Sequence, residues 1–328
     1  MANKDFLTHN QQMRKLRSNK GIICNGSADK EILCRVGYFN LINGYKAPFV
    51  EHTDSESGTH TYYKDTNIKE LFALKRFDDE LRSLLLKQIT QVEEEVRTLT
   101  AYKFDEINNL GQMPWYQIDA YDSRHGSAPI MKVIASAFRE VQQSSQEYVK
   151  YYLEHHKFIP TWIMIKVINF STFIAMLTCS KESVKKSICT MYGMLDGDGR
   201  CDFELLTGSL HWFRMVRNSC AHNERIYTMK QLGNRIKTPY FDSLARSYSE
   251  GRERKIIDLL VYLKYYCPSS EYSEFIEKVK VALLSLQTEI RANAFDQVRA
   301  AIGIKNLAHL DKLCEQPKEI KYNDLGKM

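Results

Sequence analysis

The segment from Leu210 to Tyr227 holds the residues best suited to chemistry on a phosphodiester. It reads LHWFRMVRNSCAHNERIY and combines arginines, histidines and an asparagine in a short space. The planar guanidinium of arginine can bind two phosphate oxygens at once. The imidazole of histidine titrates near neutral pH and can accept or donate a proton during a reaction. Arg217 and His222 are therefore candidates for chemistry on a phosphodiester, although a polar helix face without function explains their types about equally well.

The spacing predicts one helix from Phe203 to about Arg225, with an apolar stripe on one side. The polar arc beside that stripe spans about 140° at ~100° per residue. It contains no carboxylate and consists of Arg217, Arg214, Arg225, Asn218, His211 and His222. On an ideal helix Arg217 and His222 point about 140° apart. That angle suits a groove shared by two copies of the chain, so we expect a composite site in a homodimer.

Composition limits the other classes of function. The chain has 328 residues with 46 basic and 40 acidic side chains, a net charge of +6, and 44% apolar residues, which excludes a disordered protein. No apolar run approaches the ~18 residues of a membrane span, and no apolar segment of a signal peptide follows the basic N-terminus. We therefore expect a cytoplasmic location.

Metal and cofactor sites are not indicated. The eight cysteines are scattered without a C-x-x-C pair, so we expect them to be reduced and mostly buried. The stretch from Asp196 to Asp202 resembles the start of a calcium loop, but Cys201 and Thr207 occupy its glycine and glutamate positions. His155 and His156 are adjacent and lack ligand partners. No Walker A loop, G-x-G-x-x-G or G-x-S-x-G sequence is present, so no cofactor is predicted.

Positive charge is concentrated between Ser209 and Leu260, which carries ten basic and five acidic residues. Aromatic residues alternate with these charges, a pattern that suits a polyanion with stacking bases. The simpler alternative is a solvated face whose aromatic residues belong to the core. The residues predicted to bind RNA are Arg214, Arg225, His211, Arg252 and Arg254, and the aromatic residues are Trp212, Phe213, Tyr227, Tyr240, Phe241 and Tyr248.

Most of the chain is predicted to be helical, so the fold class is all-α. The clearest helix runs from Leu71 to Leu99, where Asp78–Arg82 and Glu93–Arg97 form i,i+4 pairs. An irregular crossing or a pair of short helices is expected over 103–129, and a small hairpin or an ordered loop within 39–63. Further helices are predicted over 130–156, 161–177, 181–195, 203–225, 241–266, 272–291, 295–302 and 305–314.

Three segments together resemble the abortive-infection Abi family of the AbiD/AbiF type. RNSCAHNERIY, which begins at Arg217, resembles that family's RN-x-C-A-H-x-x-R sequence in its HEPN domain. VGYFNLINGYKAPF from Val36 to Phe49 resembles the family's N-terminal segment. The helix from Ile68 to Tyr102, with its FD-x-x-LR and E-x3-R elements, resembles the first long HEPN helix. The likeness extends over about residues 11–227.

The resemblance implies an HEPN-like helical bundle with N-terminal and C-terminal helical extensions. The implied parts are an N-terminal segment over 1–66, an HEPN-like domain over 67–240, a helical extension over 241–315 and a tail over 316–328. The implied activity is a metal-independent endoribonuclease of phage defence or toxin–antitoxin type, with a homodimer and an antitoxin of protein or structured RNA as partners. Arg217, Asn218 and His222 match its catalytic positions, and Glu93 and Arg97 its supporting positions, although a helix-stabilising ion pair explains the last two about as well.

The expected mechanism is attack of an RNA 2′-hydroxyl on its own 3′-phosphate. His222 moves the proton, and Arg217 stabilises the charge on the phosphorane. The alternative is an HEPN-like protein that binds a structured RNA or a partner without cutting it.

Overall fold

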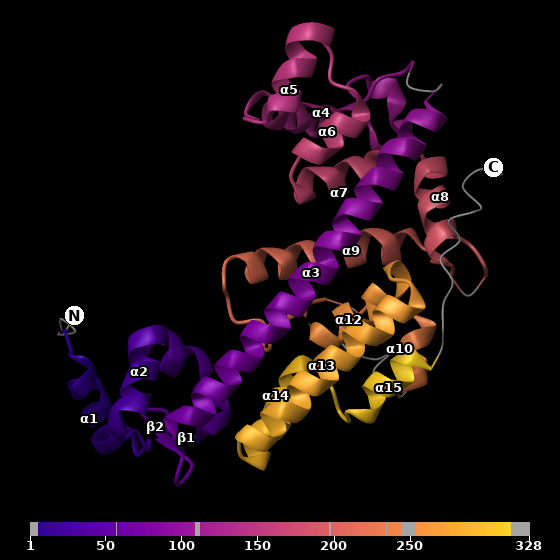
Figure 1. Cartoon of the computed structure of the whole chain (residues 1–328). Coiled ribbons are helices and arrows are strands. Elements are labelled where there is room, and N and C mark those ends of the chain that lie inside the picture. Colours follow the sequence, from indigo (N-terminus) through magenta and orange to yellow (C-terminus); the bar gives the residue numbers. More distant parts are fainter. Residues whose placement is uncertain are drawn as a thin grey trace.

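The computed structural model describes residues 6–56, 58–108, 112–196, 198–233, 235–244 and 253–315. Helices dominate these residues, and the strands form two small antiparallel sheets of two strands each (Figure 1). The predicted all-α class is confirmed.

The central element is α3, a 40-residue helix from Ile68 to Ile107. It begins at a capping box, in which the Asn67 side chain accepts from the backbone of Lys69 and the Glu70 side chain accepts from the backbone of Asn67. The predicted helix over 71–99 is confirmed. The predicted irregular crossing from 103 is wrong at its start, because Phe104 is buried and continues the apolar stripe to Ile107.

The N-terminal part packs against the first turns of α3. It consists of α1 (His9–Lys20), α2 (Gly26–Val36), a π-helical turn (Phe39–Asn43), and a hairpin of β1 (Val50–Thr53) and β2 (His60–Tyr62). In the hairpin Val50 faces Tyr62, and Thr53 faces His60. The hairpin predicted within 39–63 is confirmed.

A second group of helices packs near the end of α3. It consists of α4 (Ser127–Gln142), α5 (Glu147–Tyr151), α6 (Thr161–Val167), α7 (Phe170–Cys179) and α8 (Glu182–Tyr192). The single helices predicted over 130–156 and 161–177 are each interrupted. In the second case the break occurs because the Asn169 side chain caps α7 at Thr172, and Glu140 binds the Asn169 amide.

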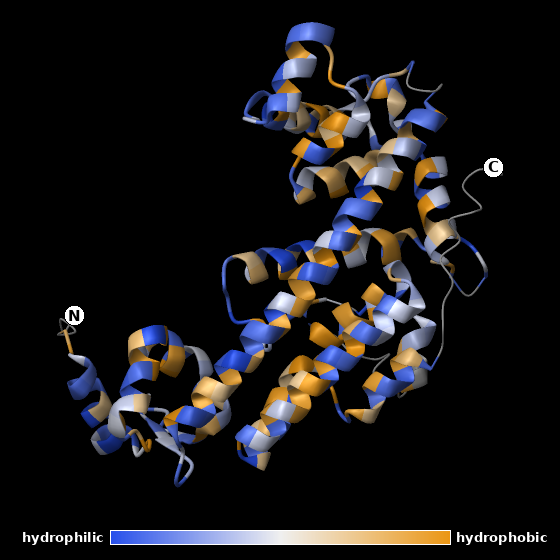
Figure 2. Ribbon diagram, in the orientation of Figure 1, coloured by the Kyte–Doolittle hydropathy of each residue, from blue (hydrophilic) through white to orange (hydrophobic). Residues whose placement is uncertain are grey.

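The rest of the chain covers the other side of α3. It comprises α9 (Phe203–Ala221), β3 (Gln231–Leu232), α10 (Pro239–Leu244), β4 (Glu253–Arg254), α12 (Ile256–Tyr266), α13 (Ser269–Glu289), α14 (Ala292–Ile302) and α15 (Ala308–Cys314). Every residue of α12 is buried, and hydrophobic residues gather where α12 and α13 meet α3 (Figure 2). The helix predicted over 241–266 is thus represented by α10 and α12, with 245–252 outside the described residues.

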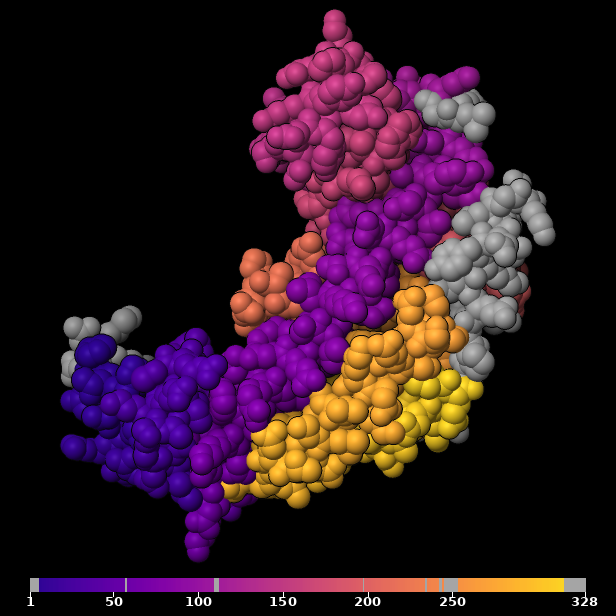
Figure 3. All heavy atoms as spheres, viewed as in Figure 1, coloured from indigo at the N-terminus to yellow at the C-terminus, as the bar shows by residue number. Residues whose placement is uncertain are grey.

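Seen in space-filling form, the N-terminal part and the α4–α7 group stand out on one side of α3 and leave a recess between them (Figure 3). The end of α9 and the loop that follows it lie in this recess (Figures 1 and 3). The segment with the richest predicted chemistry is therefore presented on a concave face.

Candidate functional site at the end of α9

The helix that carries the candidate residues is capped at its start and ends earlier than predicted. The Asp202 side chain accepts from the backbone N–H of Leu205 at 2.8 Å and begins α9. The helix ends at Ala221, not near Arg225. His222 is its C-cap, and Asn223 follows in the left-handed conformation with φ 55°. His222 and Arg225 therefore do not belong to the polar arc of the helix, and the angle of about 140° does not apply to His222.

A buried carboxylate on α3 explains why the helix stops there. The Asp78 side chain accepts from the backbone N–H groups of Ile226 at 3.2 Å and Tyr227 at 2.8 Å. It also accepts from the Tyr45 hydroxyl at 2.9 Å. These bonds favour an extended loop over another helical turn, because the backbone donors of 226 and 227 are already satisfied.

Arg82 completes this arrangement, which we call the loop clamp (Asp78 and Arg82). Its guanidinium lies 3.0 Å from the Asp78 carboxylate and donates to the carbonyl of Glu224 at 3.1 Å. The predicted Asp78–Arg82 pair is confirmed, and its function is to hold the loop that follows His222.

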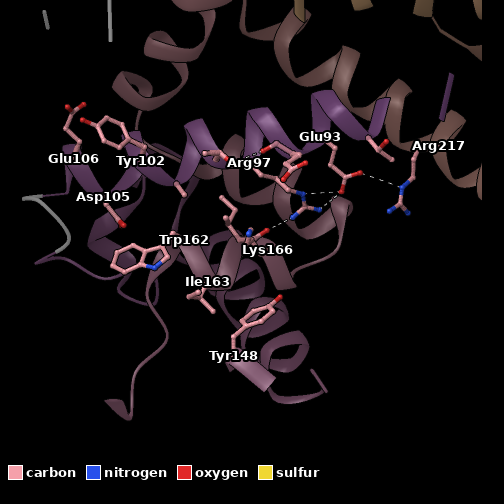
Figure 4. A pocket seen from close by; sticks show the side chains of 15 residues that line it. Glu93, Arg97, Tyr102, Asp105, Glu106, Tyr148, Trp162, Ile163, Lys166 and Arg217 are labelled. Atoms are coloured by element: carbon pink, nitrogen blue, oxygen red, sulfur yellow. Dashed lines mark hydrogen bonds and ion pairs between the residues drawn. The ribbon is translucent and has the colours of Figure 1, made fainter. Parts of the chain in front are cut away.

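The second predicted pair on α3 is also confirmed, and it lies beside Arg217. Arg97 donates to Oε1 of Glu93 at 2.7 Å and to the backbone carbonyls of Ile165 and Ile168. The other Glu93 oxygen, Oε2, lies 3.6 Å from Nε of Arg217 (Figure 4). Glu93 therefore connects the buried Arg97 to an Arg217 side chain that is 38% exposed.

The side chains of Arg217 and Asn218 are in contact, whereas the His222 side chain lies in a different groove. Arg217 donates to the side-chain oxygen of Asn218 at 3.3 Å. Arg217 lines a groove between α3 and α6 of about 990 Å³, which we call the Arg217 groove. His222 is exposed and lines a second groove of similar volume with Arg82, Arg225 and Tyr45, which we call the His222 groove. Within one chain the guanidinium and the imidazole thus serve two neighbouring grooves.

The residues predicted to bind RNA are partly engaged inside the protein. Arg214 donates to the Ser171 hydroxyl at 3.1 Å. Arg225 donates to the Thr228 hydroxyl at 2.9 Å and to the carbonyl of Gly44, which connects the loop to the N-terminal part.

Of the remaining three candidates, His211 and Arg254 are described and lie close enough to influence each other. Partial burial and the positive charges of Arg214 and Arg254 lower the pKa of His211, so this imidazole is neutral at pH 7 and adds no positive charge. Arg254 is half-buried in β4. Arg252 lies outside the described residues.

Most of the aromatic residues in the basic stretch are core residues. Trp212, Phe213, Tyr227 and Phe241 are each at most 1% exposed, so the interpretation that they stack on bases is wrong for these four. Tyr240 is half-buried, and Tyr248 lies outside the described residues.

The cysteines follow the prediction, since five of the eight are buried and all are free. Within the motif, burial raises the pKa of the Cys220 thiol to about 12, so it is not a nucleophile at neutral pH.

Sequence reasoning missed the aromatic side chains of the Arg217 groove. Trp162, Tyr102 and Tyr148 line it and are 55%, 58% and 40% exposed. No signal in the sequence separates them from core residues, because they lie in helices among apolar neighbours at ordinary helical spacing.

Two further observations concern the described part of the chain. No three of its His, Cys, Asp and Glu side chains lie close enough together to hold a metal ion. Among its helices, none combines the length and the apolar character needed to cross a membrane.

Comparison with protein families places the chain. A family model described as Abi-like protein matches residues 31–228, which include α3, α9 and the loop that follows α9. Neither the curated proteins nor the solved structures gave a significant match.

Proposed function

Because the chain belongs to the Abi-like protein family, which indicates a role in abortive infection, we propose that it is a metal-independent endoribonuclease of phage defence. The observation that carries this proposal is the presence of Arg217, Asn218 and His222 at the end of α9 on the concave face, with Arg217 oriented by Glu93 and His222 in the second groove. RNA transesterification needs a positive charge to stabilise the phosphorane and a group that transfers protons, and a carboxylate can hold the positive group in position.

In the proposed reaction the RNA supplies its own nucleophile. The 2′-oxygen attacks the adjacent phosphorus as His222 takes its proton, and the bond to the 5′-oxygen of the next nucleotide breaks. Arg217 stabilises the negative charge on the phosphorane, since a guanidinium can bind two of its oxygens. The products are a 2′,3′-cyclic phosphate and a 5′-hydroxyl, which receives a proton on leaving.

A homodimer suits this chemistry, because the histidine that takes the 2′-hydroxyl proton and returns it to the leaving 5′-oxygen can come from one chain and the guanidinium that binds the phosphorane from the other. The separation of Arg217 and His222 into two grooves supports a site in which each chain contributes a different residue. In this proposal the HEPN-like fold provides the shared face, and an antitoxin of protein or structured RNA restrains the activity.

The test is cleavage of an end-labelled single-stranded RNA by the full chain in excess EDTA. We expect a cyclic phosphate end, and a loss of about 10²- to 10⁴-fold in rate for His222→Ala. Arg217→Ala should also abolish cleavage. His156→Ala is the matched control, because that histidine is exposed on the α5 side of the molecule and lines neither groove. Cleavage that requires a divalent ion, or an equal loss in the control, would contradict the mechanism.

Mixing experiments test the shared site. In a dimer with composite sites, an Arg217→Ala/His222→Ala chain mixed with wild type should reduce the activity by more than its share of subunits. Activity proportional to the wild-type fraction would mean that each chain works alone. RNA binding by the wild type with no cleavage would favour the non-cleaving alternative.

A further inference from the structure

The Arg217 groove extends well beyond Arg217 itself. It lies between α3 and α6 and is closed at one side by Tyr148 of α5. Arg217 marks one end, Arg97 and Lys166 lie in the middle, and Trp162 and Asp105 mark the other end (Figure 4). The groove therefore leads from the proposed catalytic arginine to a separate subsite.

At the end of the groove away from Arg217, aromatic side chains are exposed to solvent and are not part of the hydrophobic core. Trp162 is 55% exposed, whereas Trp115 and Trp212 are 1% and 0% exposed. Tyr102 stands on the α3 wall of the same groove and is equally open. Exposed apolar rings gathered in one groove are unfavourable in water and indicate a surface that is covered by a ligand.

The balance of charge along the groove changes from one end to the other. Toward Arg217 the cations Arg97, Lys166 and Arg217 outnumber the carboxylates Glu93 and Glu94. Since Arg97 is bound to Glu93 and to backbone carbonyls, Lys166 and Arg217 are the cations that can meet the phosphate of a strand. At the far end stand Asp105 and Glu106, whose oxygens accept hydrogen bonds and repel phosphate.

The two far-end carboxylates differ in their engagement. Glu106 is held by Lys103 at 2.6 Å, and Asp105 accepts from the Thr161 hydroxyl through Oδ1 at 2.5 Å. Burial raises the pKa of the Asp105 carboxyl, and the Thr161 bond opposes this effect. Because Thr161 directly precedes Trp162, the Asp105 carboxylate is fixed beside the indole (Figure 4).

We propose that the Arg217 groove receives an unpaired, amino-bearing base of a single-stranded RNA, which stacks on Trp162 and donates its amino hydrogens to Asp105. Stacking on an exposed aromatic ring is how proteins hold unpaired bases. Adenine, cytosine and guanine each present an amino group with two hydrogens, whereas uracil has no amino group and presents its single N3–H donor between two carbonyl oxygens that a carboxylate repels. This inference deepens the proposed function and rests on it, because it names the substrate as single-stranded and disfavours uracil at this subsite.

The test uses the full chain with His222→Ala, so that RNA binds without being cut. Since Trp115 and Trp212 are buried, quenching of tryptophan fluorescence reports on Trp162. Cytosine and uracil have rings of the same size and differ in the amino group, so hexacytidylate and hexauridylate are compared at pH 8, where carboxylates are ionised. We expect saturable quenching by hexacytidylate, with at least about tenfold tighter binding than hexauridylate.

Two further variants separate stacking from reading of the edge. Asp105→Asn keeps an oxygen for Thr161 and adds a donor for the uracil carbonyl, so it should remove the preference for cytosine. Trp162→Ala, followed by anisotropy of labelled RNA, should weaken binding of both hexamers by about 10- to 100-fold, and Trp162→Phe should restore most of it.

Three results would overturn the inference. They are the absence of saturable quenching by either RNA, equal affinity for the two hexamers, and a Trp162 already shielded in a concentration-dependent way by a second copy of the chain. Cleavage by the wild type is scored separately. Quenching without cleavage disproves the nuclease and not the base subsite, and cleavage without quenching does the reverse.

Discussion

The Asp78–Arg82 and Glu93–Arg97 pairs have the same spacing on the same helix, but their carboxylates are used differently. Asp78 is completely buried and gives its oxygens to backbone N–H groups, a tyrosine hydroxyl and Arg82. Glu93 gives one oxygen to Arg97 and leaves the other 3.6 Å from Arg217. Asp78 is enclosed by protein and only its partner Arg82 reaches the edge of the His222 groove, whereas Glu93 and Arg97 both line the Arg217 groove.

The difference shows that one local pattern can serve structure or activity, depending on what the rest of the fold brings to it. The loop clamp fixes a backbone, so its loss should affect stability first. Glu93 orients a side chain on the concave face, so its loss should affect cleavage first. The following substitutions test this contrast, starting with the largest effect.

Asp78→Ala should lower the free energy of unfolding by about 3–5 kcal/mol, because it removes the buried carboxylate of Arg82, leaving only the partly exposed Asp79, and removes two backbone bonds of the loop. Urea unfolding of the full chain measures this loss. Asp79→Ala is the matched control, since that partly exposed neighbour also binds Arg82, and we expect a loss below about 1 kcal/mol. Equal losses for the two variants would contradict a special function for Asp78.

Glu93→Gln should reduce kcat for RNA cleavage by about 10- to 100-fold, with a smaller loss of stability than Asp78→Ala. The amide keeps an acceptor for Arg97, whose guanidinium also has two backbone carbonyls, but it no longer attracts Arg217 by charge. Glu80→Gln, an exposed position of the same helix, is the control.

A double-mutant cycle shows whether Glu93 acts through Arg217. In an Arg217→Ala background, Glu93→Gln should have little further effect on kcat. A loss that is as large in that background as in the wild type would mean that Glu93 supports the fold alone.

The smallest expected effect comes from a third carboxylate on α3, that of Glu70, whose contribution to the free energy of unfolding depends on pH. Burial alone would raise the pKa of Glu70, but hydrogen bonds from Arg291 and the backbone of Asn67 lower it below its ordinary value near 4.5. A lowered folded-state pKa means that the contribution to stability is present above pH 4.5 and is lost as the pH falls through the folded-state pKa.

Glu70→Gln should therefore cost about 1 kcal/mol at neutral pH. Urea unfolding of both chains between pH 3 and pH 7 should show this difference shrinking as the pH falls below about 4.5. A difference that stays constant over this range would mean that Glu70 contributes through its cap alone and not through its charge.

Periodicity and spacing predicted much of the fold. The long helix, both of its ion pairs and the hairpin within 39–63 depend on neighbours within a few residues along the chain, so local pattern was sufficient. The end of α9 was predicted wrongly because it is decided by Asp78, a residue 148 positions away from Ile226.

The candidate site was predictable in its residue types and not in its arrangement. The motif identified Arg217 and His222, but the sequence does not show that they serve two grooves. The exposure of Trp162 could not be predicted either, because the helix that carries it has the same apolar pattern as a core helix.

The packing of α13 along α3 has a consequence for synthesis of the chain. About 160 residues separate the end of α3 at Ile107 from the start of α13 at Ser269. At about 5–20 residues per second, the ribosome needs about 8–30 s to make them. During this time the apolar side of α3 that α13 covers is exposed on the nascent chain and is a binding surface for chaperones. The packing around α3, which supports α9 and the site at its end, is therefore finished only after α13 has been made.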